Sequence, residues 1–184
     1  GGSGDDNLTD TPSSGNGSNL LDGGNGNDKL TARSLGGNQT LVGGAGQDTL
    51  NATGQNLNLD GGADNDNLSI TGRLEVNGDD QTVKNGFSQL FGQQGDDTLN
   101  ASKYFNAELD GGDGSDSLST SGVKQQTLRG GAGNDQLNSH ISGDPRWGDG
   151  ATDDNRRVNR NLLLDGGEGD DIIRVTRGTS GLEA

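Results

Sequence analysis

The chain contains no cysteine and no methionine, and its aromatic residues are one Trp, one Tyr and three Phe. Without cysteine, neither a disulfide nor a thiolate metal site can stabilise a fold. Hydrophobic residues make up only 24% of the 184 residues, whereas 36 residues are glycine. A conventional hydrophobic core is therefore excluded, and another source of stability is needed.

Basic residues are also few, because 13 Lys and Arg stand against 28 Asp and Glu, which gives a formal net charge of −15. High net charge with low hydrophobicity is typical of chains that are disordered in salt-free water. The charge argues against a nucleic acid partner, since phosphate binding needs clustered Lys and Arg. It favours a multivalent cation instead.

Long apolar runs are missing as well. No segment approaches the roughly 18 apolar residues that a membrane span needs, and the N-terminus shows no basic-then-apolar signal sequence. The sequence starts at Gly1 without methionine and already inside a repeated motif. We therefore expect it to be a piece of a longer protein.

The repeated motif has the pattern G-G-x-G-x-D-x-(Leu/Ile)-x, and its positions are numbered here from the first glycine. Successive copies start 22, 20, 18, 31, 19, 19 and 36 residues apart, which indicates a period of about nineteen residues with two longer gaps. All eight copies keep Asp at position six. They start at Gly1, Gly23, Gly43, Gly61 (GGADNDNLS), Gly92 (GQQGDDTLN), Gly111, Gly130 and Gly166.

Aliphatic residues accompany the motif at fixed places, which predicts that each coil sends two large side chains into a common core. Apolar residues continue the alternation two positions later, as in short strands with one buried face. The residue two before the motif is Leu21, Leu41, Leu59, Leu90, Leu109, Leu128 or Leu164, position eight is Leu8, Leu30, Leu50, Leu68, Leu99, Leu118, Leu137 or Ile173, and the continuation is Ala32, Ala52, Ile70 and Ala101.

The turn itself suits a cation. Glycines at positions one, two and four allow positive φ angles, so the backbone can turn its carbonyl groups inward. Calcium takes six to eight oxygen ligands and accepts backbone carbonyls as well as carboxylates. Asp64 replaces the glycine at position four of one copy, and Asp enters the left-handed region more readily than most residues.

These copies resemble the RTX (repeats-in-toxin, haemolysin-type) calcium-binding repeat, and the resemblance covers nearly the whole chain. It implies an all-β, right-handed parallel β-roll or β-helix solenoid with stacked GGxGxD turns. It also implies that each calcium ion lies between two stacked turns, bound by the position-six carboxylates of both and by backbone carbonyls. The implied Asp ligands are Asp6, Asp28, Asp48, Asp66, Asp97, Asp116, Asp135 and Asp171.

The backbone ligands that the resemblance implies come from positions one to four of each turn. They are the carbonyl groups of Gly1, Gly2, Gly4, Gly23, Gly24, Asn25, Gly26, Gly43, Gly44, Ala45, Gly46, Gly61, Gly62, Ala63, Asp64, Gly92, Gln94, Gly95, Gly111, Gly112, Asp113, Gly114, Gly130, Gly131, Ala132, Gly133, Gly166, Gly167 and Gly169.

The chain departs from the usual family pattern, in which the motif repeats every nine residues and calcium turns lie on both sides of a flattened roll. Here the opposite turns read ATG (52–54), ITG (70–72) and TSG (120–122) and carry no Asp. This spacing predicts a single row of about five to eight ions, closer to the long-coil calcium solenoids of some bacterial adhesins.

The two long gaps receive different interpretations. Between Gly61 and Gly92 we expect a ninth, degenerate coil, with Leu74, Val76 and Val83 in the core, residues 77–81 as its turn, and weak ion sites on both sides. Between Gly130 and Gly166 we expect a side loop over about 139–161. The single domain 1–184 would then have coils at 1–22, 23–42, 43–60, 61–77, 78–91, 92–110, 111–129, 130–165 and 166–184.

The leading functional hypothesis is a calcium-dependent spacer or adhesive module without catalytic residues or enzyme activity of its own. The resemblance implies a bacterial protein secreted by the type I route, folding at the cell surface or outside the cell, with calcium and neighbouring repeats as partners. His140 has no second ligand candidate nearby, so a transition-metal site is not expected.

Several alternatives stay open at this point. A Gly- and Asp-rich chain can be a flexible linker, and the Asp and Asn residues can cap the turns of a calcium-free solenoid. Arg156, Arg157 and Arg160 near Trp147 could belong to a polysaccharide-binding or polysaccharide-active β-helix. Ice adhesion is suggested by polar ladders of Thr49, Asn51 and Thr53, of Asn67, Ser69 and Thr71, of Thr98, Asn100 and Ser102, and of Ser117, Ser119 and Ser121.

Overall fold

A computed structural model describes residues 1–11, 17–33, 37–72, 86–103, 106–122, 125–141 and 162–177. Within these ranges the chain forms sixteen strands and no helix, so no helix there is long and apolar enough to cross a membrane. The strands are β1 (Gly2–Ser3), β2 (Asn7–Asp10), β3 (Asn19–Asn25), β4 (Lys29–Arg33), β5 (Asn38–Ala45), β6 (Thr49–Gly54), β7 (Asn56–Ala63), β8 (Asn67–Gly72), β9 (Phe87–Gln94), β10 (Thr98–Ser102), β11 (Asn106–Asp113), β12 (Ser117–Ser121), β13 (Gln125–Ala132), β14 (Gln136–Ile141), β15 (Leu162–Glu168) and β16 (Ile172–Arg177).

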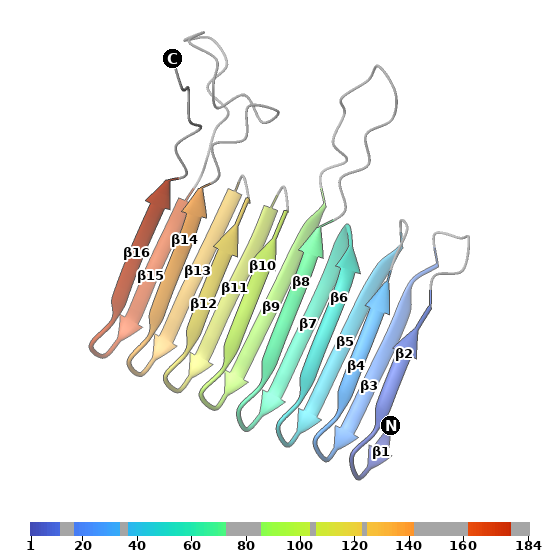
Figure 1. Cartoon of the computed structure of the whole chain (residues 1–184). Helices are drawn as coiled ribbons and strands as arrows, with labels where there is room; N and C mark the ends of the chain where they lie inside the picture. The colour runs from blue at the N-terminus through green and yellow to red at the C-terminus, as the bar shows by residue number, and fades with distance from the viewer. Residues whose placement is uncertain are drawn as a thin grey trace, which may run out of the picture.

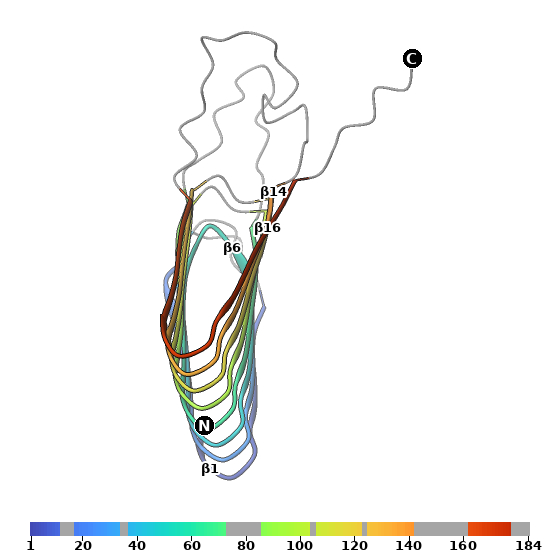
Figure 2. The same cartoon turned by 90° about the vertical axis from the view of Figure 1, so that its left-hand side faces the viewer.

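The strands form two parallel sheets that face each other. The odd-numbered strands pair in the order β1-β3-β5-β7-β9-β11-β13-β15, and the even-numbered strands form the second sheet in the same sequence order (Figure 1). Each coil contributes one strand to each sheet, and the glycine-rich turns join the two sheets along one edge (Figure 2). The expected all-β parallel solenoid is confirmed. We call this edge the turn edge and the other the opposite edge.

The register of the sheets follows from the repeat. Leucines two residues before the motif lie beside one another in the first sheet, as in the pair Leu41↔Leu59, and position-eight leucines do so in the second sheet, as in Leu50↔Leu68. A shift by one residue would move every leucine to the solvent side, so the apolar pattern specifies this register.

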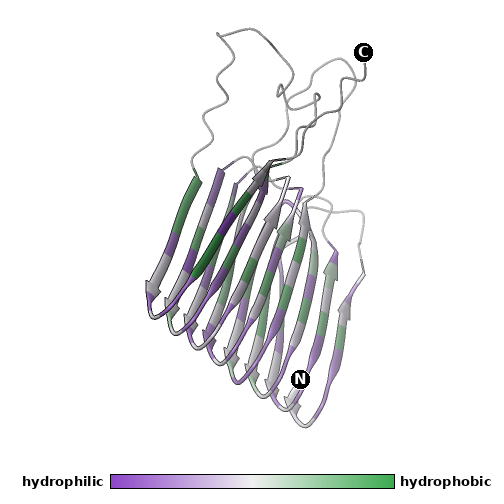
Figure 3. Cartoon of the chain, turned by 60° about the vertical axis from the view of Figure 1, so that its left-hand side comes forward, coloured by the Kyte–Doolittle hydropathy of each residue, from purple (hydrophilic) through white to green (hydrophobic). Residues whose placement is uncertain are grey.

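The core consists of two columns of leucine between the sheets, and all inner members are fully buried, as Leu30, Leu59 and Leu109 show with 0% exposure. Hydrophobic and hydrophilic residues alternate along the strands accordingly (Figure 3). Nearer the opposite edge the core is smaller and partly polar. In this part of the core, polar side chains are buried beside the expected apolar ones. They are Gln39, Ser88, Thr120, Gln126 and Ser139.

Part of this polar core forms a hydrogen-bonded cluster. The Thr120 and Ser139 hydroxyls both donate to Oε1 of Gln126, over 2.5 and 2.7 Å. Ser88 accepts from the backbone N–H of Leu57 and donates to the carbonyl of Gln55, each over 3.2 Å. Buried polar groups are tolerated when they find such partners.

The ninth coil expected between Gly61 and Gly92 is wrong. Strand β7 pairs directly with β9, and β8 pairs directly with β10, so no further coil lies between them. Strand β8 ends at Gly72 and β9 begins at Phe87, so the additional residues of the 31-residue spacing lie between these two strands in the sequence. The residues assigned to the extra coil's core and turn (Leu74, Val76, 77–81 and Val83) lie outside the described residues.

The 36-residue spacing is similar, because β13 pairs with β15 and β14 with β16. Strand β14 continues to Ile141, so residues 139–141, which were expected in the side loop, belong to a strand. Trp147, Arg156, Arg157 and Arg160 lie outside the described residues. The described residues therefore form eight coils, one for each copy of the motif.

The outer face of the second sheet carries the polar ladders in register over β6, β8, β10 and β12. Strand pairing aligns them as three uncharged rows across the sheet. These rows are Thr49, Asn67, Thr98 and Ser117; Asn51, Ser69, Asn100 and Ser119; and Thr53, Thr71, Ser102 and Ser121.

The leucine columns generate a first prediction. Replacing fully buried Leu59 with Ala should lower the free energy of unfolding by about 2–5 kcal/mol, because apolar contacts are lost and a cavity remains. The neighbouring exposed residue Asn58 provides the control, since Asn58→Ala should change stability by less than about 0.5 kcal/mol. Urea unfolding of both variants in the same buffer measures the difference, and equal effects would contradict the assigned core.

Candidate functional site

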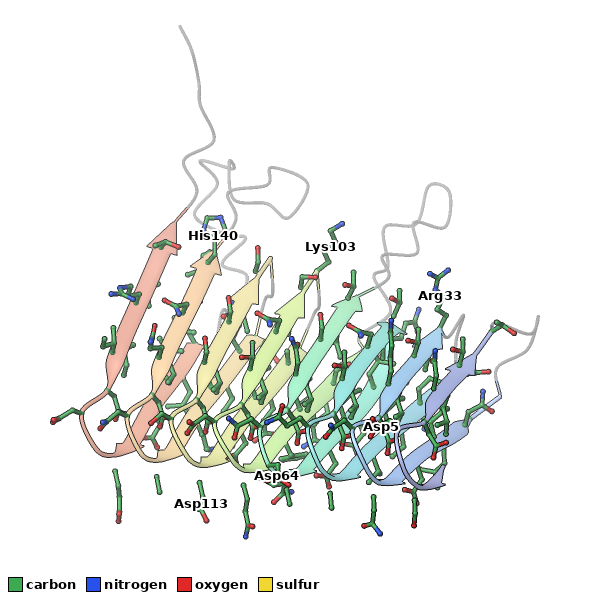
Figure 4. The ribbon with its side chains drawn as sticks, turned by 60° about the horizontal axis from the view of Figure 1, so that its bottom comes forward. Asp5, Arg33, Asp64, Lys103, Asp113 and His140 are labelled. Carbon is green, nitrogen blue, oxygen red and sulfur yellow. The ribbon has the colours of Figure 1, made fainter. Side chains whose placement is uncertain are left out.

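All eight GGxGxD turns stack at the turn edge, where each connects a strand of the first sheet to a strand of the second. Figure 4 shows Asp5, Asp64 and Asp113 at this edge, whereas Arg33, Lys103 and His140 lie at the opposite edge. Carboxylates therefore gather on one side of the solenoid, which makes the turn edge the natural place for a cation.

The position-six aspartates form a column through the turn edge. Each carboxylate after Asp6 accepts a hydrogen bond at Oδ1 from the backbone N–H of the position-six Asp in the preceding coil. The N···O distances are 2.7 Å for Asp6 to Asp28, Asp28 to Asp48, Asp48 to Asp66 and Asp66 to Asp97, 2.8 Å for Asp97 to Asp116 and Asp116 to Asp135, and 3.0 Å for Asp135 to Asp171.

The second oxygen of these carboxylates has a different environment. In the six inner turns Oδ2 is buried, and no hydrogen-bond partner for it exists among the described residues. The residues are Asp28, Asp48, Asp66, Asp97, Asp116 and Asp135, each at most 3% exposed. Burying a carboxylate oxygen without a partner is costly, so this column needs a compensating positive charge. Asp6 and Asp171, in the two end coils, are half-buried.

The first glycine of each turn shapes the space around Oδ2. A Cβ atom on Gly111 would lie 2.1 Å from Oδ2 of Asp116 and 2.5 Å from the carbonyl oxygen of Gly130 in the next turn. Gly23 shows the same arrangement, with 2.3 Å to Asp28 and 2.6 Å to the carbonyl oxygen of Gly43. The carboxylate of one turn and a backbone carbonyl of the next therefore converge on a space that only glycine leaves open.

Glycines at positions two and four allow the turns to approach each other. At Gly44, φ is +116°, and a Cβ there would lie 2.1 Å from the carbonyl oxygen of Gly24. At Gly114, φ is +136°, and a Cβ would lie 2.0 Å from the carbonyl oxygen of Gly95. Oxygen atoms of the backbone therefore line each space between successive turns, which we call an interval.

Burial changes the acidity of the column. It raises the pKa of Asp66 and of Asp116 to about 7 and that of Asp97 to about 6, against 3.8 for an ordinary Asp. Hydrogen bonds from the preceding coil lower these pKa values, and neighbouring carboxylates raise them further. Burial also raises the pKa of Asp48 and of Asp135. The column resists carrying its full negative charge unless a cation is present.

Position five has a role that the sequence analysis missed. Its side chains accept hydrogen bonds from the position-five N–H of the following coil, opposite in direction to the position-six ladder. The donors and acceptors are Asn27 to Asp5 (2.8 Å), Gln47 to Asn27 (2.8 Å), Asp96 to Asn65 (2.9 Å), Ser115 to Asp96 (2.7 Å) and Asp170 to Asn134 (2.8 Å). Position five is Asn or Asp in six of the eight copies of the motif, and this preference in the sequence could have indicated the ladder.

The oxygen donors fit calcium better than a side-chain metal centre. Among the described residues, no three His, Cys, Asp or Glu side chains are close enough to hold a metal ion together. The intervals instead offer buried carboxylate oxygens with convergent backbone carbonyls, a hard all-oxygen donor set of the kind that calcium prefers. His140 is exposed on β14, with Nδ1 2.9 Å from the Thr176 hydroxyl, so it lies in a strand and not in the expected loop.

Stacked glycine turns with one row of buried carboxylates define a calcium-binding repeat solenoid. A family model described as the RTX calcium-binding nonapeptide repeat matches residues 13–34, 35–68, 84–103, 126–140 and 163–180, more than half of the chain. The chain belongs to this family. No curated protein and no solved structure matches it.

Repeats of this family are structural elements that bind calcium and are typical of secreted bacterial proteins. The chain is therefore a calcium-binding repeat module of a secreted protein.

The raised pKa values generate a prediction for calcium-free buffer. The folded chain binds more protons than the unfolded chain between about pH 4 and pH 7, so acid should stabilise the ion-free solenoid. The stabilisation by protonated aspartates is complete below pH 3.8, the pKa of Asp in the unfolded chain. It is lost as the pH rises through the folded-state pKa values of about 6 to 7. Far-UV circular dichroism should show more β structure at pH 5 than at pH 8. Equal or lower β content at pH 5 would contradict the assigned burial.

A second prediction separates the two roles of one carboxylate. Asp116→Asn keeps an oxygen to accept the Asp97 N–H but removes the charge, whereas Asp116→Ala removes both. We expect both variants to bind calcium more weakly, and only Asp116→Ala to lose an additional 1–3 kcal/mol or so through the unpaired N–H. Calorimetric calcium titration and urea unfolding measure the two effects. Equal unfolding stability of both variants would contradict the ladder.

Proposed function

We propose that this chain is a calcium-dependent folding module that serves as a rigid spacer in its parent protein. It takes up one row of calcium ions along the turn edge and folds when calcium is supplied. One observation carries the proposal: the buried column of position-six carboxylates, whose Oδ2 atoms have no hydrogen-bond partner among the described residues.

The residues that would hold calcium are those of successive turns. The position-six carboxylates contribute charge, and the carbonyl groups of positions one, two and four lie around each interval. Eight turns leave seven intervals, so one ion in each would bring fourteen positive charges against a net charge of −15. Calcium would supply the positive charge that compensates the buried carboxylates and joins one coil to the next.

Binding and folding are coupled in this proposal. An interval exists only when two turns are stacked, so the unfolded chain offers no site and the binding energy contributes to folding. Without ions the column places like charges about 5 Å apart, near the spacing of neighbouring strands. The small core cannot compensate for this repulsion, so we propose an unfolded chain where calcium is scarce, as in cytosol, and a folded one outside the cell.

The geometry supports a spacer over a binding or catalytic role. Each coil adds one strand to each sheet in the same direction, so the length of the solenoid grows with the number of coils (Figure 1). The carboxylates with no hydrogen-bond partner for Oδ2 all occupy position six of successive inner turns, and this regular recurrence indicates a structural role.

The test is circular dichroism of the chain in chelator, followed by titration with calcium or magnesium. We expect a disordered spectrum in chelator, a β spectrum after calcium, and little change with magnesium, which demands a tighter octahedral site and loses its waters reluctantly. Elemental analysis counts the bound ions. The titration is done at pH 8, above the raised pKa values of Asp66 and Asp116, so that protonation does not replace calcium. The proposal would be falsified by a β-rich spectrum that persists at this pH in excess chelator in a sample without calcium.

A further inference from the structure

Two turns in the middle of the row carry side chains where the other turns have glycine. Gln93 occupies position two of the turn 92–97 with φ +80°, and Asp64 occupies position four of the turn 61–66 with φ +77°. These turns are neighbours, because β7 pairs with β9. We call the space between them the central interval.

The Cβ atom of Gln93 has a direct steric consequence. At the corresponding position of other turns, a Cβ would lie 2.1 Å (Gly62) or 2.0 Å (Gly131) from the position-two carbonyl oxygen of the preceding turn. Gln93 carries a real Cβ beside the turn of Gly62. At position two, the two turns can therefore not approach as closely as the other pairs do.

The backbone hydrogen bonds record this separation. In the other six intervals the position-four N–H donates to the position-three carbonyl of the following turn. The bonds are Gly4 to Asn25 (2.7 Å), Gly26 to Ala45 (2.8 Å), Gly46 to Ala63 (3.2 Å), Gly95 to Asp113 (2.9 Å), Gly114 to Ala132 (2.7 Å) and Gly133 to Glu168 (2.8 Å). In the central interval the corresponding bond from Asp64 to Gln94 is not formed, although both residues belong to the described part of the chain.

The carbonyl group at the start of the following turn is displaced too. In the flanking intervals a Cβ on the first glycine would lie 2.5 Å (Gly43) or 2.4 Å (Gly92) from the first carbonyl oxygen of the next turn. At Gly61 the three nearest atoms all belong to Asp66, the third at 3.0 Å, so the Gly92 carbonyl oxygen lies no closer than that. In the central interval the Gly92 carbonyl oxygen therefore lies farther from this space beside Asp66 Oδ2 than the corresponding oxygens do in the flanking intervals.

The rest of the central interval is regular. Asp66 donates its N–H to Oδ1 of Asp97 over 2.7 Å, and Thr98 donates to the carbonyl of Asp66 over 2.9 Å. Position four keeps its close approach, because a Cβ on Gly95 would lie 2.2 Å from the Asp64 carbonyl oxygen. The change is therefore confined to the part of the turn that lines the ion site, while the strands on both sides remain paired.

We propose that Gln93 and Asp64 interrupt the calcium row at the central interval, so that the chain contains two groups of three strong sites that fill and empty separately. The first group lies between the turns that start at Gly1 and Gly61, and the second between those that start at Gly92 and Gly166. This inference rests on the proposed calcium row. The central site binds calcium about tenfold or more weakly than the others, because the Gly92 carbonyl ligand is displaced.

The two groups differ in stability. In a stack where each coil contacts only its neighbours, a weak interval separates the units on either side. Among the described residues, the second group has four uncharged polar residues at buried inward positions (Ser88, Thr120, Gln126 and Ser139), whereas the first group has one, Gln39. The last coil of the second group also leaves Ile173 and Val175 47% exposed. The second group therefore loses its ions and unfolds first when calcium is withdrawn.

The experiment is calcium titration of the full chain by calorimetry, together with chelator-induced unfolding followed by circular dichroism. The wild type should show two transitions and about six strong sites. Asp48→Asn weakens the first group, so it should raise the midpoint of the transition at lower free calcium and leave the other transition unchanged. Asp116→Asn weakens the second group, so it should change only the midpoint of the transition at higher free calcium. Each aspartate lies in one group, so these variants assign the transitions.

The decisive variant restores glycine at both positions. The double substitution Gln93→Gly with Asp64→Gly should merge the two transitions and add a seventh strong site. Asn58→Ala is the control, because Asn58 is exposed on β7 outside the turns and this variant should keep two transitions.

A single transition with seven equal sites in the wild type would overturn the interruption while leaving the calcium row intact. Two transitions that persist in the double variant would also overturn it, since the break would then not arise from these residues. Absence of any calcium binding would contradict the proposed function itself.

Discussion

The buried carboxylate of position six is the constraint on which the rest of the structure depends. One of its oxygens is used by the preceding coil, and the other is enclosed without a partner among the described residues. A row of such groups cannot stay charged and buried unless cations compensate it. The same carboxylates connect coil to coil, so the interaction that specifies the stacking also makes it conditional on calcium.

The sequence predicted the repeat, the two leucine columns and the position-six column because each has a strict period and a single physical reason. Leu59 and Leu109 are buried as the phase of the motif requires, and Asp116 lies in the column as its spacing requires. The burial of Gln126 and Ser88 could not be predicted, since it depends on hydrogen-bond partners that only the folded coils bring near. These partners include the Ser139 hydroxyl and the Gln55 carbonyl.

The ninth coil failed for a related reason. Val76 and Val83 repeat the spacing of core residues, and short apolar spacings occur by chance in any polar segment. Pairing between β7 and β9 is decided by the fit of complete coils, which the sequence of one segment does not contain. The position-five ladder was overlooked because Gln47 and Ser115 interrupt its run of Asn and Asp, although a side chain at this position acts on the following coil only.

The number of residues between an even-numbered strand and the next odd-numbered strand varies from one, between β6 and β7, to twenty, between β14 and β15. By contrast, the turns at the turn edge all have the same length. The two edges thus have different tolerance to insertion. At the turn edge an inserted residue would disturb the stacking of successive turns. At the opposite edge new segments can be inserted without altering this stacking, so a protein of this kind can acquire new surface loops while its calcium-binding turns remain unchanged.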